Sequence, residues 1–418
     1  MKIKGAKRYD SLVNYGTGRG TSRDKLEGLR PHVRYISPDE ARSWYAANGF
    51  IQNIIDEPAE DAVREWIEIR TNRDADLNIS RLIINRLDEL NAREKLKELV
   101  RYSRLYAEGG FLYAGINATV PQTELVLATP RPAELNRIEF LNVFGPDKVS
   151  IVDNAVTPLS VDYHAKKYYI QGVSVHESRL KHLVRKYIHE YRMGISVVET
   201  ILDAVKGQDT ALWSVTSLIE EMAVWVFKSP EVKDMAPQKL AELISQMRSV
   251  LSTQSKIAIA EDEDIQRISG TDAGKGFLKE LFDFIFENLS GMAHMPKSRL
   301  MGQSQGVITA GQYDLLSYYE KVSKFQENEL RPILYWLIDM VISEREGAVY
   351  KALSGNIAGL DWELDFKPLW KLAPDEQAKV ELAQAQADQI YETTGVLTPS
   401  EIKTNRFGEL EAFGLWDE

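Results

Sequence analysis

The sequence predicts an α+β protein in which helices dominate. Three observations predict this class. Apolar residues recur at helical spacing over long stretches, a region from about residue 111 to 182 is rich in β-forming residues and turns, and long helical patterns return after residue 196. With 418 residues, the chain is long enough for two or three cores, or for one elongated subunit of several parts.

The chain before residue 196 is expected to form one α+β unit. Ser37-Pro38-Asp39-Glu40 reads as a capping box with proline at the first helical position. Gly109-Gly110 should end the last helix before the β-rich region, in which turns are expected at Gly145-Pro146 and at Gly172. We expect helices over residues 37–49, 50–64 and 77–107, a strand over 66–71, and several strands over 111–182.

Residues 196–294 are expected to form two long helices around a small α/β insert. Ser196 and Glu199 make a second capping box, which opens a helix that reaches about Phe227. Within the insert, two short strands over 256–260 and 265–268 should flank an acidic turn, and the second long helix should cover 276–289. An amphipathic helix is also expected there, with an apolar stripe made of Leu240, Leu243, Ile244, Met247, Val250 and Leu251.

The remaining chain is expected to be mainly helical. The longest helix, over 310–344, contains Pro332, which removes one backbone hydrogen bond and clashes with the preceding turn, so we expect a kink there. Residues 362–366 alternate like a strand. A helix over 374–394 should end at Gly395, and a capping box at residues 398–401 should open the last helix.

The composition excludes several classes of function. The chain has no cysteine, hence no disulfide and no thiolate site, and its formal net charge of −11 argues against a protein that grips nucleic acid over its whole surface. The first 34 residues are nevertheless basic. They could form a solvated tail, or an arm that touches a neighbouring subunit or DNA phosphate. Apolar runs are short and the start lacks the apolar core of a leader, so we expect no membrane span and a cytoplasmic location.

Candidate sites for chemistry are weak. Residues 270–276 resemble a phosphate-binding loop, but one residue is missing between the glycines, and Gly276 stands where Ser or Thr should bind magnesium. The six histidines lack the spacing that places two imidazoles on one helix face, and the Gly-x-Ser-x-Gly motif of hydrolases is absent. We therefore expect no enzyme activity, no metal and no cofactor.

Residues 295–337 carry a recognisable pattern, which reads MPKSRLMGQSQGVITAGQYDLLSYYEKVSKFQENELRPILYWL. It resembles the signature of the portal proteins of tailed bacteriophages, in a branch known as a phage-related domain. The run Asn-Ala-Thr-Gly-Glu that usually follows the loop is replaced here by residues 307–312, VITAGQ. The matching residues are Pro296, Leu300, Gly302, Ser304, Gly306, Ala310, Gly311, Tyr318, Tyr319, Gln326, Glu327, Leu330, Arg331 and Pro332.

The resemblance implies a portal fold, with Gln303, Ser304, Gln305 and Gly306 at the tip of a tunnel loop that lines the DNA channel. This tip is small, polar and uncharged, so it could touch a moving duplex without lasting ion pairs. The expected parts are an N-terminal tail and wing (1–195), a first stem helix (196–227), a small α/β clip (228–272), a second stem helix (273–294), the tunnel loop (295–310), a long kinked wing helix (311–345), a wing-completing strand (346–371) and a helical crown (372–418).

The resemblance also implies a function. Portals are homo-oligomeric rings, usually of twelve subunits, which are assembled in the host cytoplasm and set at one capsid vertex of the virion. They contact the major capsid protein, dock the terminase large subunit, pass double-stranded DNA without sequence specificity, and hold head-completion, adaptor and tail proteins. Two alternatives remain open: an intracellular helical scaffold or adaptor that never meets DNA, and an enzyme with a site around residues 270–276.

Overall fold

The structure is a computed structural model of the chain. It describes residues 35–73, 77–116, 121–122, 124–125, 135–153, 166–188, 194–221, 223–228, 236–239, 241–242, 264–269, 273–301, 308–370, 374–395 and 398–399. Within these ranges the protein has the mixed helical and β composition that the sequence predicts. Among the described helices, none combines the length and the hydropathy needed to cross a bilayer.

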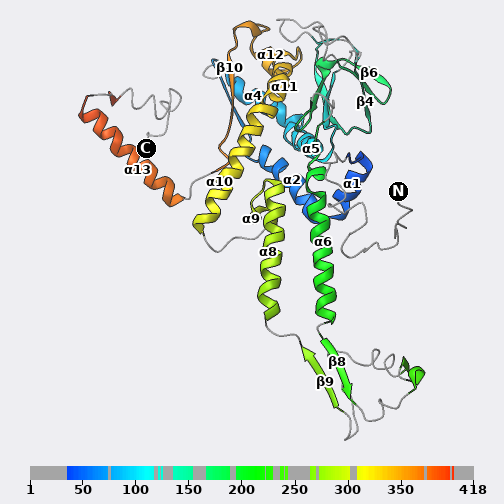
Figure 1. Cartoon of the computed structure of the whole chain (residues 1–418). Coiled ribbons are helices and arrows are strands. Elements are labelled where there is room, and N and C mark those ends of the chain that lie inside the picture. The colour runs from blue at the N-terminus through cyan, green and yellow to red at the C-terminus, as the bar shows by residue number, and fades with distance from the viewer. Residues whose placement is uncertain are drawn as a thin grey trace, which may run out of the picture.

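Two long helices extend from a folded body and give the molecule its elongated shape (Figure 1). Helix α6 (Val197–Glu221) leaves the body, and helix α8 (Ala273–Ala293) returns beside it in the opposite direction. At their far end lie strands β8 (Ala223–Lys228) and β9 (Asp264–Ser269), which pair antiparallel. The body therefore carries a two-helix projection with a small sheet at its tip.

The capping signals set the first helices. The Ser37 hydroxyl accepts a hydrogen bond from the Glu40 amide at 3.3 Å and begins α1 (Pro38–Ala47), as predicted. The Asn48 side chain caps α2 (Gly49–Arg64) by accepting from the amides of residues 50 and 51. Strand β1 (Ile67–Thr71) follows where a strand was predicted.

The single helix predicted over residues 77–107 is wrong, because the structure has two helices there. Helix α4 (Ile79–Glu89) ends before Asn91, whose φ of 52° is left-handed, and α5 (Ala92–Leu105) follows. Asparagine tolerates this conformation better than most residues. Both helices bury their apolar stripes in the same core. The helical spacing of apolar residues therefore continues across the break, and the sequence pattern does not reveal it.

The predicted β-rich region forms two three-stranded antiparallel sheets. One has the order β3-β2-β7 and the other the order β4-β5-β6. Their strands are β2 (Gly110–Ile116), β3 (Ile138–Phe144), β4 (Val149–Asp153), β5 (Lys166–Ile170), β6 (Val173–Val175) and β7 (Leu180–Leu183), with the 3₁₀ turn η2 (Glu177–Arg179) before β7. Gly109 admits no side chain, because its φ is +82° and a Cβ would lie 2.2 Å from the carbonyl oxygen of Leu183.

The first long helix is shorter than predicted. It ends at Glu221 rather than near Phe227, and its last predicted residues form β8, whose sequence AVWVFK favours a strand. The partner of β8 is β9, which covers the predicted strand 265–268. The other predicted strand of the insert, 256–260, and every residue of the predicted apolar stripe from Leu240 to Leu251 lie outside the described residues.

The longest helix is interrupted by a π-helical turn just before Pro332, the residue at which a kink was predicted. Helix α10 (Ile308–Phe325) passes into the π segment η4 (Gln326–Leu330) and then into α11 (Arg331–Ser343). The Arg331 amide donates to the carbonyl of Gln326, five residues earlier. Pro332, which has no N–H, stands in the first turn of α11, where a helix does not need one.

The remaining elements close the body and lead away from it. Strand β10 (Trp362–Phe366) pairs antiparallel with β1, so the start and the end of the body share one sheet. The others are α9 (Lys297–Met301), α12 (Ala348–Ala352), the 3₁₀ turn η5 (Ile357–Gly359) and α13 (Pro374–Thr393). Gly395 follows α13 with φ +72°, as the predicted helix end requires.

A buried ion pair crosses the body. Glu344, which follows α11, is 0% exposed, and its two carboxylate oxygens accept from Nε and Nη2 of Arg86 at 2.9 and 3.0 Å. The same carboxylate accepts from the amide of Ile138 at 2.8 Å. Three segments that are distant in sequence, α4, β3 and the end of α11, thus share one charged centre.

We expect Glu344→Ala to lower the free energy of unfolding by about 3–5 kcal/mol, because it leaves the Arg86 guanidinium buried without this partner. The matched control is Glu89→Ala. Glu89 binds Nη1 of the same arginine at 2.7 Å, but its side chain is 59% exposed, so its loss should cost less than about 1 kcal/mol. Urea unfolding followed by circular dichroism measures both. Equal losses in the two variants would contradict the account of the buried pair.

Candidate functional site

One buried carboxylate holds both sides of the segment 302–307. Asp61 of α2 is 2% exposed, and its oxygens accept from Nη2 of Arg299 in α9 at 2.6 and 2.8 Å. They also accept from the hydroxyl of Tyr318 in α10 at 2.9 Å and from Nη1 of Arg64 at 2.6 Å. Asp61 therefore joins α9, which precedes residues 302–307, to α10, which follows them.

The position of Asp61 follows from the pattern of α2. Ile54, Pro58 and Asp61 are spaced i, i+4 and i+7, so the carboxylate lies on the face that packs against the core. A buried carboxylate is unfavourable unless it is paired and hydrogen-bonded, and three donors satisfy this one.

The charges of this cluster reinforce one another. Burial first, and then the negative charge of Asp61, raise the pKa of Tyr318 far above its ordinary value, so its hydroxyl remains a donor at all physiological pH. Burial alone would lower the pKa of Arg299, but Asp61, Tyr319 and Glu57 together raise it. Tyr318 and Arg299 therefore both remain hydrogen-bond donors at physiological pH.

Two further hydrogen bonds join α9 and the π turn η4 to α2. Leu300 is fully buried, and its carbonyl accepts from the side-chain amide of Asn53 at 3.3 Å. The side-chain amide of Gln326 donates to the carbonyl of Ala62 at 2.9 Å. Ala62 lies in the last turn of α2, where helix carbonyls lack partners within the helix, so the buried glutamine of the π turn caps this helix end.

The π turn is also tied to the edge sheet. Arg331 forms a fork with Glu327, at 2.5 Å from Nε to Oε2 and 2.9 Å from Nη2 to Oε1, and this bond lowers the pKa of Glu327. Arg331 also donates from Nη1 to the carbonyl of Leu364 in β10, and its guanidinium lies 5.6 Å from the centre of the Phe366 ring. The direction of the long helix is therefore set by β10 as well as by α2.

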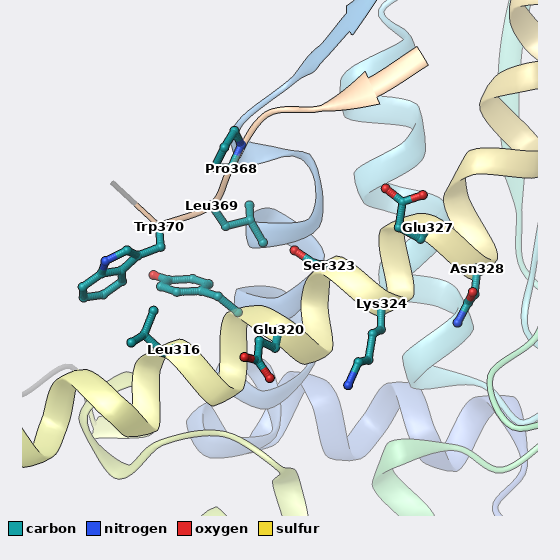
Figure 2. Close-up of a pocket in the computed structure, with 10 residues that line it drawn as sticks. Leu316, Glu320, Ser323, Lys324, Glu327, Asn328, Pro368, Leu369 and Trp370 are labelled. Carbon is teal, nitrogen blue, oxygen red and sulfur yellow. The ribbon is translucent and has the colours of Figure 1, made fainter. Parts of the chain in front are cut away.

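An open groove runs along the outer face of α10 (Figure 2). Its volume is about 430 Å³, and the chain at residues 368–370 forms its other wall. Trp370 and Leu316 lie at one end, and Lys324 and Asn328 lie at the other. The Tyr319 ring is 6.2 Å from the Trp370 ring between centroids. Tyr319 thus links the long helix to the segment that leads to α13.

The structure brings part of the predicted signature together. Leu300, Tyr318 and Gln326 are buried around α2, while Tyr319, Glu327 and Arg331 lie at the edge of this cluster. Three other signature residues have backbone roles: Pro296 precedes α9 and its carbonyl accepts from residues 299 and 300, Gly311 lies within α10, and Pro332 begins α11. The predicted channel residues Gln303, Ser304, Gln305 and Gly306, with Gly302, lie outside the described residues.

Sequence reasoning missed the acidic and basic partners of the signature, namely Asp61, Arg64 and Arg299. A charged residue on the apolar stripe of α2 was the available signal. Of the weak phosphate-loop motif, residues 270–272 lie outside the described residues, and residues 273–276 form the first turn of α8. Within the part of the chain that the structure describes, no three His, Cys, Asp or Glu side chains are grouped so that they could hold a metal.

Comparison with known proteins identifies related sequences. A family model described as "Phage portal protein" matches residues 39–390. Two relatives are named anti-CBASS protein Acb1: one from Caulobacter sp. (strain RHG1) is 25% identical over 89% of this chain and 61% of its own length, and one from Sphingomonas paeninsulae is 24% identical over 93% and 63%. A protein of Haemophilus influenzae, named only as uncharacterized, is 27% identical over 86% and 79%. The chain thus spans about three fifths of the first two relatives.

Solved structures with some similarity come from phage-like particles. A chain of the neck of an empty gene transfer agent particle has a TM-score of 0.48 at 15% identity, covering 91% of this chain and 96% of that chain. An HK97 family phage portal protein from Corynebacterium diphtheriae has a TM-score of 0.37 at 9% identity, covering 79% and 95%. Because these TM-scores lie below 0.5, we draw no structural conclusion from them.

The Asp61 cluster predicts a specific effect on α9. We expect Asp61→Asn to speed hydrogen exchange of the amides in residues 297–301 by about tenfold or more, because Arg299 loses its charged partner and local opening becomes easier. The matched control is Glu57→Gln. Glu57 binds Nη1 of the same arginine at 3.2 Å, but its side chain is 35% exposed, so the exchange rates should change much less. Similar exchange in both variants would show that Asp61 does not hold this segment.

Proposed function

This chain belongs to the phage portal protein family, and we propose that it forms a ring at one vertex of the capsid, through which double-stranded DNA passes during packaging and ejection. The observation that carries the proposal is the anchoring of segment 302–307. Arg299 before the segment and the signature residue Tyr318 after it both bind the buried carboxylate of Asp61, which supports a loop that must keep its place against a moving duplex.

The arrangement of elements supports the assignment of portal parts. In this assignment α6 and α8 are the stem helices, the strands β8 and β9 belong to the clip, segment 302–307 is the tip of the tunnel loop, and α13 begins the crown. The wing comprises the sheets and helices before residue 196 together with α10, α11 and β10. Since α6 ends at Glu221, we place the start of the clip at Ala223 instead of residue 228.

Exposed aromatic residues on the stem helices support assembly. Trp213 of α6 is 72% exposed and Phe284 of α8 is 64% exposed, and among the side chains that the structure describes, those of each helix that join the core lie at its body end. Large apolar side chains on both helices of a projecting pair are expected to be covered by a neighbour, and a second copy of the same chain is the partner that a closed ring supplies.

The charge of the chain supports a conduit rather than a DNA clamp. DNA carries one negative charge per roughly 1.7 Å of its axis, so a channel lined with fixed cations would retain it. A ring of chains that each carry a formal charge of −11 is strongly anionic, and the tip Gln303-Ser304-Gln305-Gly306 is uncharged. The duplex would then pass without sequence-specific contacts.

The further partners belong to the same proposal. They are the terminase large subunit during packaging, the major capsid protein around the ring, and head-completion, adaptor and tail proteins after packaging. The ring would be assembled in the host cytoplasm and kept in the virion. No catalytic step is proposed for the chain itself. The anti-CBASS activity named for two relatives is not transferred to it, because the chain covers only 61% and 63% of those proteins.

Assembly separates this proposal from a scaffold or adaptor that acts as a monomer or dimer. Purified protein at micromolar concentration should form a closed ring, of about 570 kDa (12 × 47.5 kDa) if twelve chains assemble. Trp213→Asp with Phe284→Asp should shift it to single subunits, because buried charges would oppose the stem contacts. Val173→Asp, at a body residue that is 48% exposed, is the control and should still form rings. Light scattering that shows only a stable wild-type monomer would contradict the proposal.

The tunnel loop gives a second test. Replacing Gln303 and Gln305 by lysine would add two cations per chain at the proposed channel wall, so DNA should be retained and packaging should slow or stall, most clearly at low salt. The same two residues replaced by serine remain uncharged and should package normally. Ring assembly should survive in both variants. Normal packaging by intact lysine-variant rings at low salt would remove this loop from the DNA path.

A further inference from the structure

Tyr318, which binds Asp61, also lines a second cavity. Its volume is about 400 Å³, and it is formed by α2, α5, α10, the end of α8 and the turn after β7. Part of its wall is apolar, including Val100, Val322 and Phe325. The basic residues that line it are Arg104, Arg185, Lys186, His294 and Lys321. Among the described residues that line this cavity, none is acidic.

Arg104 is placed in this cavity by a defect in α2. Pro58 has no N–H, so the carbonyl of Ile54, four residues earlier, lacks its helical partner. Nη2 of Arg104 donates to that carbonyl at 2.7 Å. The Nε atom of Arg104 is buried and makes no hydrogen bond to the described residues. The guanidinium is therefore fixed in orientation and still has a free donor.

Arg185, which also lines the cavity, has a buried donor without a partner among the described residues too. Its Nη1 atom is buried and makes no hydrogen bond within the described part of the chain. Burial and the nearby charge of Arg185 lower the pKa of Arg104 to about 10, and burial also lowers the pKa of Arg185. Two buried guanidinium groups that repel each other are costly unless an anion joins them.

Three more basic groups complete the rim. Lys186 and His294 both adopt left-handed backbone conformations, with φ of 48° and 56°, and Lys321 lies on α10. The pKa of His294 is lowered first by burial and then by Lys321, Lys186, Arg185 and Arg104. All four cations are thus close enough to act on one imidazole, which makes the cavity a convergent cationic site.

We propose that this cavity binds a phosphate group, supplied either by a free phosphate compound or by a DNA backbone. A phosphate offers several acceptor oxygens and up to two negative charges, and guanidinium groups bind it through paired hydrogen bonds. A single carboxylate would neutralise only part of a site with four cations. The size of the cavity lies within the range of small-ligand pockets. This site does not depend on the proposed passage of DNA through the ring.

The test is a titration of the full-length assembly, at low and constant ionic strength, with inorganic phosphate and separately with a short DNA duplex. Saturable phosphate binding of one ion per chain is expected, and it should raise the pKa of His294 in proton NMR, because a nearby anion favours the imidazolium. Arg185→Gln should weaken the affinity by about tenfold or more. The control is Lys324→Gln, at a residue that lines the groove of Figure 2 and not this cavity, and it should bind like the wild type.

The two sources of phosphate give different results. If free phosphate is the ligand, the duplex will not compete with it, whereas a duplex that displaces phosphate and is itself weakened by Arg185→Gln identifies the DNA backbone. Absence of saturable binding in both arms, or equal binding by Arg185→Gln and the wild type, overturns the proposal. It is also overturned if phosphate binds only to Glu190→Gln, since an acid of the chain itself, outside the described residues, would then neutralise the site.

Discussion

The buried carboxylate of Asp61 joins three helices that are far apart in the sequence. Through it, α9 and α10 are both attached to α2. The carboxylate is tolerated in the core because Tyr318, Arg64 and Arg299 all donate to it. Arg64 also donates to the carbonyl of Leu369 at 2.9 Å, so the same cluster fixes the chain that leads to α13.

The π turn before Pro332 helps to set the direction of the long helix relative to α2 and β10. It allows Gln326 to cap α2 and Arg331 to bind the β10 edge, although the two residues are only five positions apart. A π turn within a helix often marks a functional position.

Much of the fold could be predicted from local signals in the sequence. Neighbouring residues alone determine the cap at Ser37, the turns at glycines and the helix irregularity next to Pro332. The structure has each of them. The break at Asn91 could not be predicted, because the apolar stripe continues through it and only packing in three dimensions selects the left-handed conformation. The strand β8 could not be predicted for the same reason, since its pairing with β9 depends on residues some forty positions away.

The candidate site was predictable only in part. The resemblance identified Tyr318, Gln326 and Arg331, but their partners lie more than 250 residues away for Asp61 and Ala62, and 33 residues away for Leu364. Such pairings arise from the tertiary fold and leave only an indirect mark in the sequence, which here is an acid on an apolar helix face.

We propose that residues 302–307 face the axis of a ring. Electron cryomicroscopy of the purified full-length assembly tests it most directly. The account predicts a closed ring in which residues 302–307 form the narrowest part of an axial channel, with their flanks attached to Asp61. A ring that places residues 302–307 on its outer surface, or a protein that remains monomeric at micromolar concentration, would contradict it.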